Sequence, residues 1–144
     1  MSDDDVTKSS EPRNAAAYGW VGLAAWSCLG LALEAAHGWK VSVYLDNALT
    51  RLLLTLAHAH GAMLSLVLIA FGVHGAAQLD AGETWPRRAL LSAWLLMPLG
   101  FALGAIAHPE SDPSLGIVLV PIGALLLIAA LIRIAIASWK RTTP

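Results

Sequence analysis

Charged side chains are scarce in this chain. Of its 144 residues, 13% are Asp, Glu, Lys or Arg, whereas soluble domains usually carry about 25%. The net charge is −1, so no basic patch is left to meet the phosphates of a nucleic acid. Hydrophobic residues make up 57% of the chain, which excludes intrinsic disorder. Because they are grouped in long runs, the sequence is not typical of a soluble enzyme either.

Familiar catalytic motifs are also missing. The sequence has no phosphate-binding P-loop, no GxSxG nucleophile elbow, no HExxH zinc motif and no CxxC pair. It has no CxxCH site for covalent haem attachment. With one cysteine, Cys28, it cannot form an intrachain disulfide. Any chemistry must therefore come from residues outside these motifs.

What the sequence does contain is four long apolar runs. A hydrocarbon core about 30 Å thick takes about 20 helical residues to cross. Helices are the expected form, because backbone groups in lipid must be satisfied within the segment. The sequence therefore predicts an all-α integral membrane protein, with one domain over residues 15–139. Its four transmembrane helices are expected at about residues 15–36, 50–79, 88–107 and 114–139.

The segments between these helices are short and polar. Such connections predict antiparallel neighbours, and so an up-down-up-down bundle. Asp46 or Asn47 is the expected N-cap of the second helix. Residues 1–14 lack the basic n-region and short apolar core of a cleaved signal peptide, so they are expected to form a disordered cytoplasmic tail. Residues 140–144 form a second cytoplasmic tail.

Basic residues are unevenly divided between the two sides of this topology. Seven lie on the side of the chain ends and two on the other, and by the positive-inside rule both termini face the cytoplasm. The expected location is the plasma (inner) membrane. The seven are Lys8, Arg13, Arg87, Arg88, Arg133, Lys140 and Arg141, and the two are Lys40 and Arg51.

Four histidines and one carboxylate fall near the extracytoplasmic side. His58 and His60 lie about 9–12 Å inside the second helix, while His37 and His108 end the first and third helices, and Glu34 precedes His37 by one turn. Ionisable groups in lipid normally face the bundle interior. Imidazole and carboxylate suit Cu, Fe and Zn, and two axial histidines suit haem b. We therefore predict a haem or transition-metal site with His58 and His60 as principal ligands and with His108, His37 and Glu34 as supporting ligands.

Helix geometry limits this prediction. Residues 58 and 60 differ by about 200° around the helix axis, so both imidazoles cannot point at one partner. A di-iron carboxylate site needs two E-x-x-H pairs and two further glutamates, and this chain has only the Glu34–His37 pair in its apolar runs. We therefore reject that assignment.

A short motif in the second helix resembles known haem and copper proteins. His58-Ala59-His60-Gly61 is similar to the paired-histidine helices of the NnrS family and of the large subunit of haem-copper oxidases. The resemblance covers four of 144 residues. The resemblance points to haem or copper proteins and transfers no ligand assignment. The expected role of a haem or metal centre held by the histidine cluster is electron transfer or that of an oxidase accessory.

A second interpretation needs no cofactor. Gly100 and Gly104 form a GxxxG pair in the third helix, and Gly61 forms a small-residue pair with Ala57. Such residues let membrane helices approach closely and can mediate self-association. The protein would then be a non-catalytic bundle, in contact with lipid and with itself or a larger membrane complex. The two interpretations differ in whether the histidine nitrogens converge to within about 3–5 Å, as metal bonds of ~2 Å require.

Overall fold

The computed structural model describes residues 3–106 and 112–142, with side chains from Asn14 onward. It is helical, and these residues contain no strand. The elements, in chain order, are α1 (Asp3–Gly38), α2 (Ser42–Leu45), α3 (Ala48–Val73), the 3-10 turn η1 (Gly75–Gln78), α4 (Trp85–Gly104), the 3-10 turn η2 (Leu115–Val118) and α5 (Leu119–Thr142).

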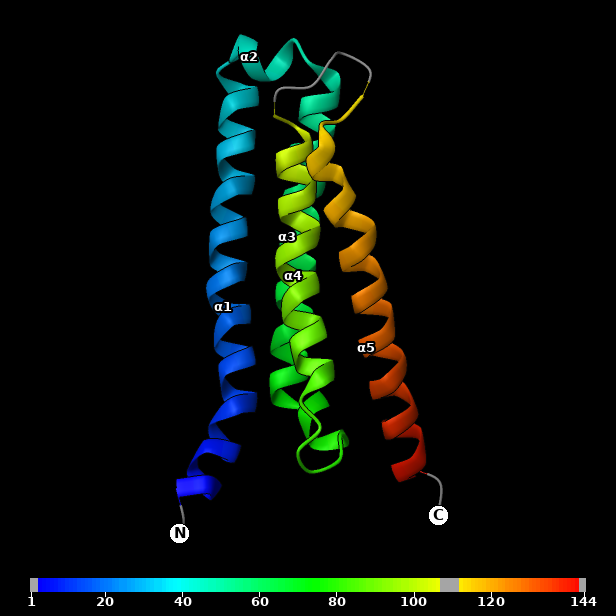
Figure 1. Ribbon diagram of the computed structural model, residues 1–144. Coiled ribbons are helices and arrows are strands. Elements are labelled where there is room, and N and C mark those ends of the chain that lie inside the picture. The colour runs from blue at the N-terminus through cyan, green and yellow to red at the C-terminus, as the bar shows by residue number, and fades with distance from the viewer. Residues whose placement is uncertain (1–2, 107–111, 143–144) are drawn as a thin grey trace.

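The four long helices lie side by side (Figure 1). α1 packs on α3, α3 on α4, and α4 on α5, so α3 and α4 are central and α1 and α5 flank them. α1 begins and α5 ends at the same end of the molecule, while α2 lies at the opposite end (Figure 1). We call these the terminal end and the α2 end.

Three helices are long and apolar enough to cross a bilayer. They are Asn14–Gly38, Ala48–Val73 and Leu115–Thr142, with 25, 26 and 28 residues. α4 is shorter, with 20 residues, and its first turn contains Arg87 and Arg88. Its apolar part therefore falls below the roughly 20 residues that a full crossing takes. The described residues thus support three membrane-spanning helices, whereas the sequence predicted four.

Several helix ends differ from the sequence-based boundaries. α1 begins at Asp3, although residues 1–14 were predicted to be disordered. α3 ends at Val73 and not at residue 79, since Gly72 and Gly75 weaken the helix there. α4 runs from Trp85 to Gly104, with Pro86 in its first turn, where proline is well tolerated.

The connection from α1 to α3 is defined by two local motifs. α1 ends in a Schellman arrangement, in which the Val41 N–H donates to Ala36 O at 3.0 Å and the Lys40 N–H donates to His37 O at 3.1 Å. Lys40 has a φ of 54°, a left-handed conformation that favours glycine. At the start of α3, Asn47 Oδ1 accepts from the Thr50 N–H at 2.9 Å, which confirms it as the N-cap. Together these motifs hold α2 across the end of the molecule.

Small residues bring α1 and α3 into close contact. A Cβ atom added at Gly61 would collide with the indole of Trp26, and one added at Gly19 would lie 2.7 Å from the Ser65 carbonyl oxygen. Ser65 is fully buried. Its hydroxyl donates to Gly61 O at 2.7 Å and accepts from Trp94 Nε1 at 2.9 Å, which ties α3 to α4. This seam positions the site described next.

Candidate functional site

His58 connects α3 to α1. Its Nδ1 lies 2.7 Å from the carbonyl oxygen of Trp26, and because a carbonyl only accepts, Nδ1 donates the proton. The imidazole lies over Gly30, where an added Cβ would collide with the ring. The glycine thus makes room for the histidine between the two helices, and Nε2 of the neutral ring is left as an acceptor.

His60 faces a different neighbour. Its Nδ1 donates to Leu56 O of its own helix at 2.9 Å. Its ring centroid lies 4.8 Å from that of Phe101 in α4, with the planes tilted by 39°. His58 therefore faces α1 and His60 faces α4, as their separation of about 200° around the axis predicts.

The structure does not support the predicted histidine cluster. His37 is exposed at the end of α1, and His108 lies outside the described residues. Within residues 3–106 and 112–142, no three His, Cys, Asp or Glu side chains come together to hold a metal ion. The physical reason is the helix period, which turns His58 and His60 onto separate interfaces where each Nδ1 is bonded to a backbone carbonyl.

Two of the predicted residues do share a site. Glu34 and His58 line a cavity of about 290 Å³ at the α2 end, between α1 and α3. Tyr44 of α2, Thr55 of α3 and Ser27 of α1 contribute three hydroxyl groups to the same walls. Ser27, Glu34 and Thr55 are exposed, so the cavity is an open hollow on the surface of the helices. One carboxylate, one imidazole and three hydroxyls form a hydrogen-bonding site that can hold a small ligand.

The hydroxyl residues of this cavity were not identified from the sequence. Ser27, Gly30 and Glu34 lie at the helical spacing i, i+3, i+7, so the sequence pattern could have predicted that they share one face of α1. Thr55 and His58 form a similar pair on α3. Tyr44 had no signal, because its place depends on the path of the chain between α1 and α3.

The third-helix glycines contact α5. A Cβ at Gly100 would lie 2.8 Å from Val120 Cγ2, and one at Gly104 would lie 3.4 Å from Ile117 Cδ1. The GxxxG face is therefore occupied within the chain, by η2 and the start of α5. Self-association of the protein has to use another surface.

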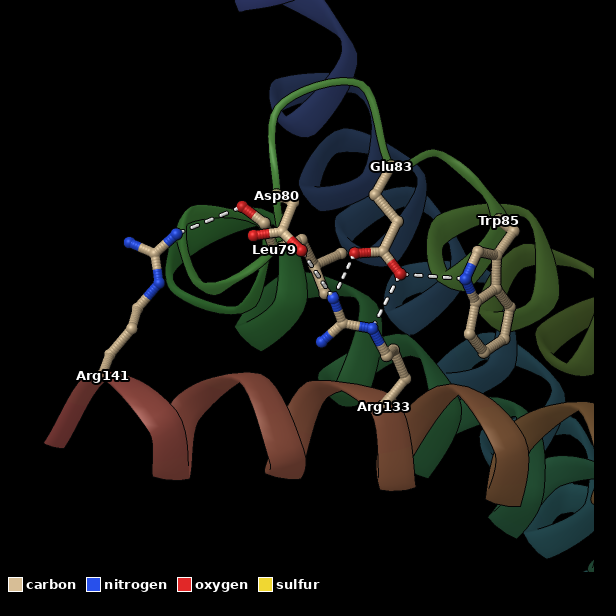
Figure 2. A network of polar contacts seen from close by, with 6 residues as sticks. All are labelled: Leu79, Asp80, Glu83, Trp85, Arg133 and Arg141. Atoms are coloured by element: carbon tan, nitrogen blue, oxygen red, sulfur yellow. Dashed lines mark hydrogen bonds and ion pairs between the residues drawn. The ribbon is translucent and has the colours of Figure 1, made fainter. Parts of the chain in front are cut away.

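A polar network joins α5 to the segment before α4 (Figure 2), and this segment lies at the terminal end of the molecule (Figure 1). Arg133 of α5 donates from Nε to Glu83 Oε1 at 2.8 Å and from Nη2 to Glu83 Oε2 at 2.6 Å. Nη2 also lies 3.0 Å from Asp80 Oδ2, and Trp85 Nε1 donates to Glu83 Oε1 at 2.9 Å. Arg141 Nη2 donates to Leu79 O at 3.3 Å.

The role of this network follows from its geometry. The paired Nε and Nη2 bonds hold both oxygens of Glu83, an arrangement that is stronger than a single contact. The Glu83 and Arg133 side chains are 15% and 24% exposed, and every polar group of the carboxylate is engaged. The network satisfies a charge within an apolar helix and fastens α5 to the turn before α4, so it is structural.

Comparisons with known proteins add no relatives: no family model, no curated protein and no solved structure matches this chain.

Proposed function

We propose that the protein is a multi-pass membrane protein that acts as a non-catalytic subunit or interaction partner in a larger membrane complex. In this proposal α4 is a fourth pass despite its short apolar part, because it packs against both α3 and α5 and so needs less contact with lipid. The course is then up-down-up-down, and the terminal end faces the cytoplasm. The membrane is the plasma (inner) membrane. The seven-to-two distribution of basic residues supports this orientation.

The observation that carries the proposal is how the two lipid-depth histidines are used. His58 hydrogen-bonds across helices to Trp26 O, and His60 bonds within α3 and packs on Phe101. These are packing interactions, and hydrogen bonds of this kind in lipid average about 0.6 kcal/mol. They explain the presence of both histidines without a haem or a metal.

The outer surfaces support an assembly role. Only 11% of the apolar stretch is buried within the chain in both α1 and α5, against 33% in α3. On α5 this leaves Leu125 at 70% exposed and Ile132 at 55%. Apolar surface of this extent requires lipid or protein around it. Because α1 and α5 form the two flanks, each offers a complete helix face to its surroundings.

Optical and metal analysis tests the non-catalytic assignment. The protein purified from cells supplied with haem and metals is expected to be colourless, with no Soret band and well under one metal per chain. His58→Ala is expected to lower stability without removing any bound group. A Soret band or a stoichiometric metal that is lost in His58→Ala or His60→Ala would falsify the assignment.

The orientation and the assembly have separate tests. On a Cys28→Ser background, a membrane-impermeant maleimide is expected to label Ser42→Cys in intact cells and Ala81→Cys only after lysis; the reverse pattern contradicts the topology. Native mass spectrometry of the protein extracted with its surrounding lipid is expected to give a defined assembly larger than one chain. A monomer under all extraction conditions contradicts the subunit role.

A further inference from the structure

The cavity at the α2 end is lined by both polar and apolar residues. Ser27, Gly30 and Glu34 line it from α1, and Thr55 and His58 line it from α3. Tyr44 of α2 lines it as well. Leu31 and Leu33 supply apolar surface. Glu34 lies one turn from the end of α1, and Ser27 lies about 10 Å deeper along the axis, at 1.5 Å per residue.

Acceptors dominate the polar lining. The Glu34 carboxylate accepts only, and no hydrogen bond or ion pair of this group is found within the described part of the chain. His58 uses its Nδ1 proton on Trp26 O, which leaves Nε2 as an acceptor in the neutral ring. The hydroxyl groups of Ser27, Tyr44 and Thr55 accept as readily as they donate. No lysine or arginine lines the cavity.

We propose that this cavity binds a primary ammonium group that carries a short apolar substituent. The three protons of an ammonium ion match the acceptors, and the exposed Glu34 carboxylate supplies the opposite charge. The Tyr44 ring adds a surface that attracts cations. Leu31 and Leu33 accommodate the substituent, so the charged and apolar parts of the ligand each meet a suitable wall.

Other classes of ligand fit these walls less well. An anion would be repelled by Glu34 and would find no cationic side chain. A transition metal needs about four donors, and Glu34 and His58 are the only lining residues of metal-binding type. The volume of about 290 Å³ lies at the small end of ligand pockets, which span about 300–1,000 Å³. An amine with a chain of a few carbons is therefore the expected size.

A primary ammonium group could come from a free amine or from the headgroup of phosphatidylethanolamine. The cavity is partly open and is lined by Glu34 near the end of α1 and by Tyr44 of α2, so both sources can reach it. The site chemistry is the same for both, and the lipid composition around the protein distinguishes them.

Calorimetric titration of the protein in nanodiscs tests the proposal. In pure phosphatidylcholine discs, n-butylammonium is expected to give saturable heat after subtraction of empty discs, while n-butanol and butyrate give none. Replacing part of the lipid with phosphatidylethanolamine weakens n-butylammonium binding if the headgroup is a ligand, and leaves it unchanged if the site takes free amines. No saturable heat, or equal binding of n-butanol, overturns the proposal.

Variants locate the binding in this cavity. Glu34→Gln is expected to raise the Kd for n-butylammonium at least tenfold. The matched control Asp46→Asn removes the same charge from another exposed position at the same end, outside the cavity lining, and is expected to keep the Kd within twofold. Ser27→Leu fills the cavity without changing charge and is expected to abolish binding, which covers the case that Glu34→Gln misfolds. Wild-type affinity in a folded Glu34→Gln or Ser27→Leu protein overturns the assignment.

Discussion

The contact between Gly61 and the Trp26 indole predicts how a single methyl group affects stability. In Gly61→Ala the new Cβ meets the indole ring, and to relieve this α1 must move away from α3 or the indole must change rotamer. Overpacking of this kind costs about 1–3 kcal/mol. Movement of α1 also weakens the His58–Trp26 bond, worth about 0.6 kcal/mol in lipid. Alanine returns at most about 1 kcal/mol through its helix propensity, so we expect a net loss of about 1–2 kcal/mol.

The assay is the free energy of unfolding in mixed micelles titrated with dodecyl sulfate. Gly38→Ala is the matched control, because a Cβ at Gly38 meets nothing within 4 Å; it is expected to be neutral or stabilising. Both variants gain the higher helix propensity of alanine, and only Gly61→Ala meets a side chain. A loss of stability in Gly61→Ala alone therefore identifies the steric effect.

A double-mutant cycle identifies the colliding partner. Trp26→Leu removes the ring, so Gly61→Ala should cost at least about 1 kcal/mol less in that background. A Gly61→Ala protein as stable as Gly38→Ala, or strictly additive effects with Trp26→Leu, would refute the predicted close packing of α1 on α3.

Three further substitutions test other parts of the structure by the same unfolding measurement. Ser65→Ala leaves the Trp94 N–H without its acceptor and should cost about 1–2 kcal/mol; wild-type stability would show that this bond is not formed. Glu83→Gln should destabilise by about 1–3 kcal/mol because it breaks the two-point contact with the guanidinium, whereas Asp80→Asn, whose side chain is 83% exposed, should change stability by less than ~0.5 kcal/mol; equal effects contradict the assigned geometry. Lys40→Gly should stabilise by up to about 1 kcal/mol by relieving the left-handed strain, and a loss of stability would argue against the Schellman turn.

The helices were largely predictable, because hydrophobic run length and capping are local properties. Asn47, one of the two residues predicted as the cap, is the N-cap of α3. The count of spans was less predictable. The prediction counted flanking residues as part of the third span. In the structure α4 includes Arg87 and Arg88 in its first turn and ends at Gly104, so its apolar part is shorter than predicted.

The candidate site was predicted in part. The sequence indicated that His58 and His60 face different ways, since residues two apart lie on nearly opposite sides of a helix. It also placed Glu34 and His58 at the same end. It could not indicate that Glu34 shares a cavity with His58 while His60 packs on Phe101, because these pairings depend on how α1 and α4 are rotated against α3.

Segment composition was enough to predict that long apolar helices form and where polar groups interrupt them, since partition into lipid is a property of each segment. Which polar groups meet depends instead on how the helices pack against one another. Gly30 and Gly61 let α1 approach α3 until His58 reaches the Trp26 carbonyl, and this approach leaves the cavity between Glu34 and Tyr44. Such pairings depend on how the small and large side chains of two helices fit together. The sequence of one helix alone therefore cannot predict them.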